Sequence, residues 1–193
     1  MNAETRFRGR LEVPLAERGH EEASELASSL AGAGLSAVYT SPLERARDVA
    51  RAICAACGVS GYTDLPGLLN LDYGSWHGLT RDEAAERYPD AWRLYRVAPE
   101  RARCPGGEAL ADAADRVTEA LLALGERHRG ESVAAVTHGV MVRLAALRSS
   151  CGPRTDWEIP LAAGSATVFE AANGKLSLPQ ATSGTTRIEL VAP

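Results

Sequence analysis

Lysine, cysteine and long apolar segments are all scarce in this chain of 193 residues. Lys175 is the only lysine against many arginines, which we attribute to genomic base composition rather than to a mechanism. The net charge of −4 argues against nucleic acid or an anionic membrane as the main partner. No apolar run approaches the length of a membrane span, and residues 1–6 do not resemble a signal peptide. We therefore expect a cytoplasmic protein.

The four cysteines do not form a recognisable redox or metal site. Cys54 and Cys57 make a Cys-x-x-Cys motif near the carboxyl end of an alanine-rich helix, where the helix dipole disfavours a thiolate. Cys104 and Cys151 are too distant in sequence to complete a zinc-binding spacing. We expect reduced, structural thiols, and the sequence implies no metal or organic cofactor.

A hydrophobic content of 45% over residues 1–193 is sufficient for one domain with its own core, and no linker divides it. Helices are predicted over 15–30, 41–57, 80–88 and 140–147, with a long helix after the loop 105–107. Strands are predicted over 35–40 and 133–137, an extended segment over 62–71, and more peripheral strands over 166–171 and 176–178. This alternation predicts an α/β fold, a three-layer α/β/α sandwich with a mainly parallel sheet.

Two of the predicted helices begin with capping boxes. Ser41-Pro42-Leu43-Glu44 offers serine as the N-cap, proline at the first helical position and glutamate at the third. Thr80-Arg81-Asp82-Glu83 repeats the pattern. The long helix has an apolar stripe that predicts its buried face, made of Leu110, Ala113, Ala114, Val117, Leu121 and Leu124.

The segment from Ser132 to Arg143 is the clearest indication of a site. Its β-branched and small apolar residues show no alternation, which predicts a strand buried on both faces that ends at His138-Gly139. In an open α/β sheet, ligands bind beyond the carboxyl ends of strands and beside helix N-termini. His138 occupies such a position, although a histidine that only caps the following helix has the same local sequence.

Arg45 is the second candidate. It lies in the first turns of a helix that follows a strand, and helix side chains lean toward the N-terminus, so it can reach the same sheet edge as His138. A guanidinium beside a helix N-terminus suits a phosphate or a carboxylate. The alternative is a solvated helix residue.

Four segments then occur in a characteristic order: 41–47, Asp72-Tyr73-Gly74-Ser75-Trp76-His77-Gly78-Leu79-Thr80, Pro105-Gly106-Gly107-Glu108 and Thr137-His138-Gly139. Together they resemble the phosphoglycerate mutase-like branch of the histidine phosphatase superfamily, over residues 2 to about 171. The resemblance implies a phosphoenzyme mechanism. A histidine in an Arg-His-Gly motif ending the first strand attacks phosphorus, a second histidine and two arginines hold the phosphoryl oxygens, and a carboxylic acid protonates the leaving oxygen.

Carried over by this resemblance, His138 is the second histidine and Arg45 the second arginine. Asn2 matches an asparagine that contacts the phosphate, and Gly139 is a further phosphate-binding residue. The segment Arg6-Phe7-Arg8-Gly9 resembles the loop that borders the pocket. The implied partner is a small phosphorylated metabolite, and a homodimer is left open.

Two departures from the family pattern bear on catalysis. The chain contains no Arg-His-Gly, and neither His20 nor His128 is placed to replace it. Asn70 stands where relatives commonly carry the glutamate that donates a proton, and an amide cannot act as an acid. His77 or Asp72 could substitute, but both could equally be loop residues that pack or hydrogen-bond.

The missing motif also has a structural consequence. In this family the first strand lies inside the sheet, beside the strand that ends in His138. A gap there would leave rows of unpaired backbone groups, each buried one costing roughly 1–3 kcal/mol, against a domain stability of about 5–15 kcal/mol. The chain should therefore fold poorly unless another segment fills the gap. As the simpler account, we expect the coding sequence to continue upstream of Met1, with an apolar strand closing on Arg-His-Gly.

Three functions follow as hypotheses. The first is a metal-independent phosphatase or phosphomutase that uses a phosphohistidine once the missing strand is restored, with His138, Arg45 and Asn70 at the catalytic site. Hydrolysis is favoured over mutase action because the short segment 70–80 resembles the small phosphatases. The second is a relative repurposed for another reaction on a phosphorylated or carboxylated metabolite, and the third is a non-catalytic module that binds the anion. The sequence leaves the substrate open.

Overall fold

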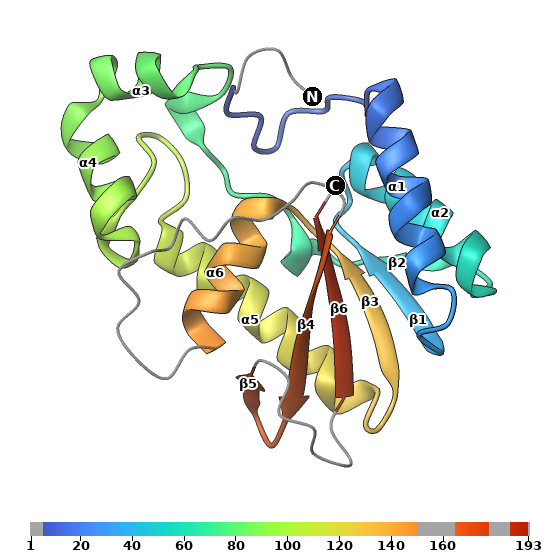
Figure 1. Cartoon of the computed structure of the whole chain (residues 1–193). Helices are drawn as coiled ribbons and strands as arrows, with labels where there is room; N and C mark the ends of the chain where they lie inside the picture. Colours follow the sequence, from blue (N-terminus) through green and yellow to red (C-terminus); the bar gives the residue numbers. More distant parts are fainter. Residues whose placement is uncertain (1–5, 150–164, 178–185, 193) are drawn as a thin grey trace.

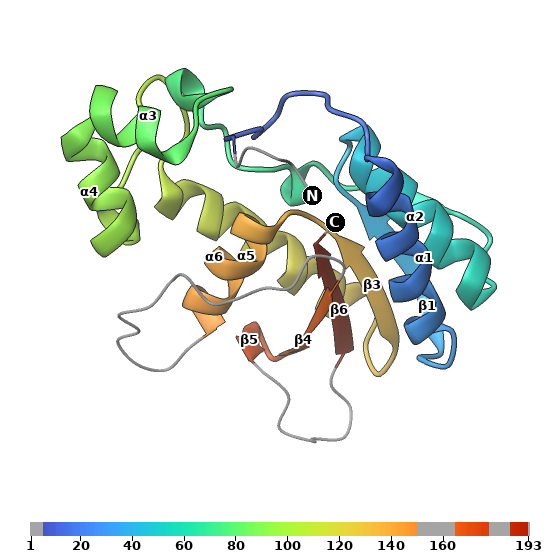
Figure 2. The ribbon, with the colours of Figure 1, turned by 45° about the horizontal axis from the view of Figure 1, so that its top comes forward.

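In the computed structural model, which describes residues 6–149, 165–177 and 186–192, a six-stranded sheet lies between layers of helices (Figures 1 and 2). The strand order is β2-β1-β3-β6-β4-β5; β4 pairs antiparallel with β6 and β5, and the other neighbouring pairs are parallel. The predicted α/β fold with a mainly parallel sheet is confirmed. The strands are β1 (Leu35–Thr40), β2 (Tyr62–Asp64), β3 (Ser132–Val136), β4 (Ser165–Ala172), β5 (Lys175–Ser177) and β6 (Thr186–Ala192).

Two pairs of helices cover the two faces of the sheet. α1 (Glu17–Leu30) and α2 (Glu44–Cys57) share one apolar cluster with Val38, Ala134 and Val191. α5 (Leu110–Arg127) and α6 (Gly139–Ser149) share the other with Ala135 and Leu190. Successive residues of β3 and β6 thus point to opposite faces, which explains why the sequence of the parallel strands shows no polar alternation. The predicted buried stripe of α5 is confirmed at every position.

β6 corrects the expectation of a sheet without its central strand. It lies between β3 and β4, parallel to β3 with Val191 level with Val136, and antiparallel to β4. The buried side chains of Ile188 and Leu190 fill the core on the α5 side. The gap predicted beside β3 is therefore absent, because a segment far along the chain supplies the missing hydrogen bonds.

The two predicted capping boxes have different outcomes. At α3 (Arg81–Arg87) the backbone N–H of Glu83 donates to Thr80 Oγ1, and the Thr80 N–H donates to the Glu83 carboxylate, as predicted. The box at Ser41 is wrong: α2 begins at Glu44, and its N-cap residue Leu43 has no side-chain cap. The Ser41 hydroxyl instead lies 2.9 Å from His138 Nε2, so a tertiary partner replaces the local one.

The segment 88–104 contains α4 (Pro89–Val97) and a 3₁₀ turn at Pro99–Arg101. Two further 3₁₀ turns are Pro66–Leu68 and Gly74–Trp76. Aromatic rings tie α4 to the rest of the domain. The Tyr95 ring of α4 lies 5.3 Å from the Trp76 ring and 6.1 Å from the Phe7 ring, measured between centroids. This packing fixes α3 and α4 above the carboxyl edge of the sheet (Figure 1).

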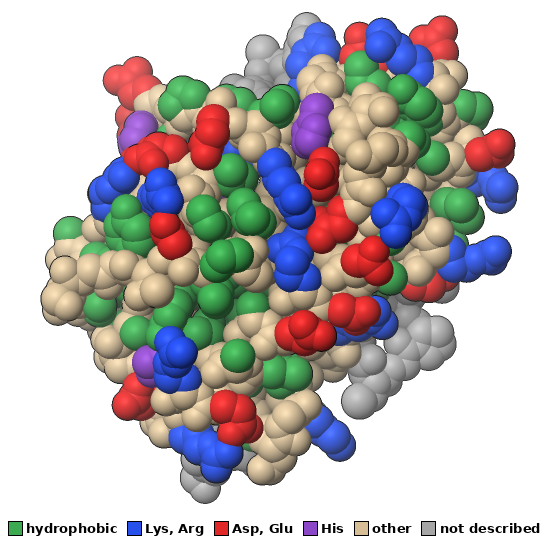
Figure 3. Space-filling model, turned by 180° about the vertical axis from the view of Figure 1, so that it is seen from behind, with side chains coloured by type: hydrophobic (Ala, Val, Ile, Leu, Met, Phe, Trp, Pro, Cys, Tyr) green, Lys and Arg blue, Asp and Glu red, His purple; other side chains and the backbone are tan. Residues whose placement is uncertain are grey.

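Charged side chains of both signs are mixed over the back of the molecule, with no single-sign stripe on that face (Figure 3). Arg47 and Asp64 form a surface ion pair 2.6 Å apart. Within the described residues, no helix combines the length and the apolar character that crossing a membrane requires.

Candidate functional site

His138 lies at the carboxyl end of β3, where the chain turns into α6. Its side chain is 5% exposed, and its Nε2 is held by the Ser41 hydroxyl. The preceding Thr137 donates its backbone N–H to Val191 O at 2.8 Å and its hydroxyl to Leu68 O at 2.7 Å. The turn that presents His138 is thus fixed by β6, by the start of α2 and by the loop before residue 70.

Burial is the main reason why the pKa of His138 lies well below its ordinary value, and the positive charges of Arg45 and Arg116 lower it further. The imidazole is therefore neutral near neutral pH. A neutral imidazole keeps one nitrogen lone pair and one N–H donor, so it can accept a proton or donate a hydrogen bond.

This depressed pKa predicts a stability that depends on pH. Below about pH 6.5 the histidine of the unfolded chain, with a pKa near 6.5, is protonated, whereas folded His138 stays neutral. The free energy of unfolding should therefore fall as pH drops below about 6.5, by at most about 1.4 kcal/mol per pH unit. Urea unfolding between about pH 5 and pH 7.5 measures the slope. His138→Gln should flatten it, whereas His20→Gln, at an exposed helix position, should not. An equal slope in His138→Gln contradicts the prediction.

A cavity of about 350 Å³ opens beside His138. Among the described residues its lining contains four arginines and no aspartate or glutamate, so this part of the surface facing a ligand is strongly positive. The helix dipole of α6 adds to this field, because the first residues of that helix form part of the wall. The lining residues are Arg6, Phe7, Arg8, Gly9, Asn70, Tyr73, Arg81, Tyr95, His138, Gly139, Val140 and Arg143.

Arg45 lies behind this wall rather than in it. Its side chain is 5% exposed, and its two terminal nitrogens donate to Leu11 O at 2.8 Å and Gly9 O at 2.7 Å. Burial is the main reason why the pKa of Arg45 lies below its ordinary value, while the charge of Glu12 raises this pKa and that of Arg8 lowers it. Arg45 is therefore at the predicted sheet edge, but it also anchors the loop that borders the cavity.

Asn70 lines the cavity and is 8% exposed. Its amide nitrogen donates to Gly9 O at 3.1 Å, and its amide oxygen accepts from the backbone N–H of Leu71 at 2.8 Å. The Gly9 carbonyl thus receives donors from both Asn70 and Arg45. Both polar ends of the Asn70 side chain are engaged in fixing backbone at the rim of the cavity.

Neither alternative proton donor lines the cavity. His77 Nε2 accepts from the backbone N–H of Arg10 at 3.4 Å, and Asp72 accepts from the backbone N–H of Gly74 at 2.9 Å. Gly9 has φ +48°, and a Cβ there would lie 2.4 Å from His77 Nε2, so only glycine allows this approach. His77 and Asp72 therefore support the loop rather than face the ligand.

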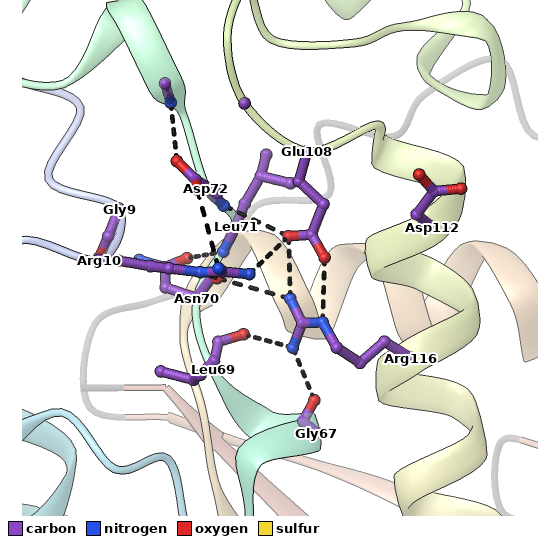
Figure 4. A network of polar contacts seen from close by, with 12 residues as sticks. Gly9, Arg10, Gly67, Leu69, Asn70, Leu71, Asp72, Glu108, Asp112 and Arg116 are labelled. Carbon is purple, nitrogen blue, oxygen red and sulfur yellow. Dashed lines mark hydrogen bonds and ion pairs between the residues drawn. The ribbon is translucent and has the colours of Figure 1, made fainter.

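A network around Glu108 holds the strand-like segment that carries Asn70 (Figure 4). Both Glu108 carboxylate oxygens accept from Arg116 at 3.0 Å, and one also accepts from Arg10 at 3.2 Å. Arg116 donates further to the carbonyls of Gly67 and Leu69, each at 2.9 Å. Bidentate arginine–carboxylate pairing gives this support a fixed geometry.

The Pro105-Gly106-Gly107 motif permits a close backbone crossing next to this network. A Cβ on Gly107 would lie 2.4 Å from Asp72 O, and one on Gly74 would lie 2.4 Å from Gly107 N. The backbone N–H of Ser75 donates across the crossing to Pro105 O at 2.8 Å. Both glycines are needed for the two loops to meet.

The structure brings His138, Gly139, Asn70 and the predicted loop 6–9 together at one cavity, with Arg45 directly behind. Asn2 and Cys151 lie outside the described residues. Sequence reasoning missed Arg81 and Arg143 in the cavity wall and the roles of Glu108 and Arg116 beneath it. For Arg143 a signal existed, since it lies on the helix that His138 precedes.

The other histidines and the thiols lie elsewhere. His128 contacts the Tyr39 hydroxyl at 2.9 Å and Glu131 at 2.8 Å, by the first residue of β3 rather than its carboxyl end. Cys54, Cys57 and Cys104 are free thiols. In the described ranges no group of three histidine, cysteine or carboxylate side chains is arranged to hold a metal ion.

Comparison with known proteins gives consistent matches. The family model of the histidine phosphatase superfamily (branch 1) matches residues 1–182, which leaves β6 outside the match. Phosphoglycerate mutase-like protein 4 of Arabidopsis thaliana is 35% identical over 144 residues, covering 74% of this chain and 63% of that protein. Phosphoserine phosphatase 1 of Hydrogenobacter thermophilus is 33% identical over 138 residues, covering 72% and 65%. The chain therefore spans a little under two thirds of these curated relatives.

Solved structures agree with the fold. YhfR of Bacillus stearothermophilus superposes with a TM-score of 0.80 at 28% identity, over 91% of this chain and 88% of that one. Mycobacterial glucosyl-3-phosphoglycerate phosphatase superposes with a TM-score of 0.69 at 26% identity, over 80% and 77%.

Proposed function

Since the chain belongs to the histidine phosphatase superfamily, we propose that the cavity beside His138 binds a small phosphorylated metabolite through its phosphoryl group. The observation that carries this proposal is the lining itself, in which the described residues include four arginines, a neutral histidine and the first turn of α6, but no carboxylate. A phosphoryl group carries dispersed negative charge, and guanidinium and helix N–H groups are the donors that match it.

Each residue has a distinct part in this proposal. His138 and the backbone of Gly139 contact the phosphoryl oxygens. Arg45 uses two of its five N–H donors on backbone carbonyls, so the remaining donors can serve the anion. Asn70 fixes the rim through Gly9 and contributes no proton.

Hydrolysis through a phosphohistidine is the chemistry that we assign to this site when a nucleophile is present. Two relatives are named phosphoserine phosphatases, which favours hydrolysis over mutase action. Of the four histidines in the sequence, only His138 lines the cavity. We therefore propose that the 193-residue chain binds its ligand and hydrolyses it slowly at best. The cavity wall without an acid also supports the second candidate, a relative that only binds or has changed its chemistry.

Calorimetry with inorganic phosphate tests the proposed site. Arg45→Ala should weaken phosphate binding by about 1.5–3 kcal/mol, the scale of a charge-assisted hydrogen bond. Arg47→Ala, on the same helix but paired with Asp64 at the surface, is the matched control and should leave the affinity unchanged. Circular dichroism of each variant verifies folding, because Arg45 also anchors the loop at Gly9 and Leu11. Equal affinity in wild type and a folded Arg45→Ala contradicts the assignment.

A further inference from the structure

The contact between Ser41 and His138 joins two turns that follow neighbouring parallel strands. Ser41 comes directly after β1, His138 comes two residues after the end of β3, and Ser41 Oγ lies 2.9 Å from His138 Nε2. The backbone on both sides is fixed, because the Ser41 N–H donates to Val136 O at 2.8 Å and His138 O accepts from the Met141 N–H at 2.8 Å. The sheet and the start of α6 therefore hold the hydroxyl and the ring at this distance.

The proton of the Ser41 hydroxyl has a single acceptor within the described part of the chain. Ser41 is fully buried, and its Oγ contacts only His138 Nε2 and, at 3.5 Å, the backbone N–H of Leu43. The Leu43 N–H is itself a donor, so only the imidazole can accept the hydroxyl proton. Because a buried hydroxyl without an acceptor is destabilising, the Ser41 O–H donates to Nε2.

This direction of donation determines which nitrogen of the neutral His138 ring carries the proton. A neutral imidazole has one N–H, and Nε2 supplies its lone pair to Ser41, so the proton lies on Nδ1. The two ring nitrogens point in divergent directions, so Nδ1 is directed away from Ser41. His138 lines the cavity, whereas Ser41 is not among the described lining residues, and Nδ1 bonds to no described residue. The Nδ1–H is therefore available to a ligand.

The opposite tautomer would present the wrong group to an anion. With the proton on Nε2, a nitrogen lone pair would be directed toward the cavity, where it repels a phosphoryl oxygen, and the buried Ser41 hydroxyl would lose its acceptor. With the proton on Nδ1, the uncharged ring donates a hydrogen bond to that oxygen.

We propose that Ser41 is a positioning residue, which holds the proton of the His138 imidazole on Nδ1 so that this N–H donates to the phosphoryl group of the ligand. The inference rests on the proposed function, because it takes the phosphoryl group beside His138 as given. Ser41 acts through His138 and does not itself contact the ligand.

Nuclear magnetic resonance of the chain labelled with ¹⁵N-histidine measures the tautomer, because a ring nitrogen with a lone pair resonates far downfield of one that carries a proton. The sequence contains four histidines, and the signals that disappear in His138→Gln belong to His138. At about pH 7.5, above the ordinary histidine pKa, we expect a protonated Nδ1 and an unprotonated Nε2 in wild type. The reverse assignment overturns the proposal.

Substitutions at Ser41 test its role. Ser41→Ala should move the His138 proton partly or wholly to Nε2 and weaken the binding of inorganic phosphate about three- to tenfold, the scale of one hydrogen bond. Ser41→Thr keeps the hydroxyl and should keep the wild-type tautomer and affinity. Thr40→Val is the matched control, because it removes a neighbouring buried hydroxyl that donates to Ser41 O at 3.1 Å, and it should leave the tautomer unchanged.

A purely structural role for Ser41 predicts a different result. A folded Ser41→Ala chain that keeps its proton on Nδ1 overturns the proposal, whatever its stability. If Ser41→Ala does not fold, the response of wild type decides: phosphate should shift the Nδ1 resonance of His138 more than the Nε2 resonance, and the opposite order overturns the proposal.

Failure of the proposed function gives a distinct result. If calorimetry shows no binding of phosphate to wild type, the proposed function is overturned, and the role of Ser41 toward a ligand falls with it, even where the tautomer is as expected. If phosphate binds equally well to wild type and to a folded Ser41→Ala chain with an altered tautomer, the phosphate site stands and the role of Ser41 is overturned.

Discussion

Phosphatase activity is expected to appear when the end of β6 is rewritten as Arg-His-Gly. The chain with Ala192→Arg, Pro193→His and an added C-terminal glycine should hydrolyse p-nitrophenyl phosphate about 10³-fold faster than the 193-residue sequence, or better, because a nucleophilic imidazole divides one difficult hydrolysis into two easier steps. A chelator should not reduce this rate.

The position chosen for the new histidine follows from the register of the sheet. Val191 of β6 is level with Val136 of β3, and His138 comes two residues after Val136. If the register continued for two more residues, we would expect a histidine introduced there to come level with His138. This is the sheet position in which the family resemblance places the strand that ends in Arg-His-Gly. β6 thus occupies the sheet position of the strand that carries the nucleophile, but its sequence does not contain Arg-His-Gly.

The expected reaction proceeds in two displacements. An imidazole nitrogen of the new histidine attacks phosphorus, the P–O ester bond breaks, and the electron pair leaves with nitrophenolate, which needs no proton. Water then attacks the phosphohistidine and the P–N bond breaks, which releases phosphate. His138 and Arg45 stabilise the charge on the equatorial oxygens in both steps.

The matched control carries Ala192→Arg, Pro193→Ala and the same glycine, so that only the imidazole differs. An acid-labile phosphoenzyme should form in the histidine version and be absent from the alanine version. His138→Ala in the active version should lower turnover. Equal rates for the histidine and alanine versions contradict the placement of β6 at the catalytic position.

Local patterns in the sequence predicted the parts of the fold that depend on local physics. The bounds of β1, the buried stripe of α5 and the capping box at Thr80 all follow from the period of apolar residues or from contacts within four residues. His138 was placed correctly because the end of a buried parallel strand is itself a local signal.

The errors came from partners distant in sequence. β6 was missed because its role depends on hydrogen bonds to β3 and β4, which nothing within residues 186–192 specifies. Ser41 carries a good capping sequence, but His138, 97 residues away, takes its hydroxyl. With the sheet position filled, unpaired strands are no longer a reason to expect an upstream continuation, which stays a prediction.

Arg45 shows that partners distant in sequence also limited the prediction of the site. Its sequence position predicted a free guanidinium at a helix start, whereas two backbone carbonyls from the loop at 9–11 are its observed partners. The cavity wall likewise combines side chains from α3, α4 and α6 that no spacing connects. The sequence predicted a phosphorylated ligand, which stays a prediction, but it did not predict Arg81 and Arg143 in the cavity wall.

Asn70 should limit the rewritten enzyme to esters with good leaving groups. Its amide donates to Gly9 O and accepts from Leu71 N, and no carboxylate is among the described residues that line the cavity. Nitrophenolate departs without a proton, whereas an alkoxide does not. Wild-type Asn70 should therefore allow hydrolysis of p-nitrophenyl phosphate and only slow hydrolysis of alkyl phosphates.

Asn70→Glu in the rewritten chain is expected to raise turnover of alkyl phosphates by about 10²-fold or more, the usual scale of general acid catalysis. The gain with p-nitrophenyl phosphate should be much smaller, because that leaving group needs no acid. Asn70→Gln is the matched control, since it lengthens the side chain equally and offers no acidic proton. Steady-state rates on propyl and nitrophenyl phosphate measure the difference. If the rewritten chain with Asn70 already cleaves propyl phosphate as fast as nitrophenyl phosphate, another group supplies the proton, and His77, next to Gly9 at the rim, is the first to replace.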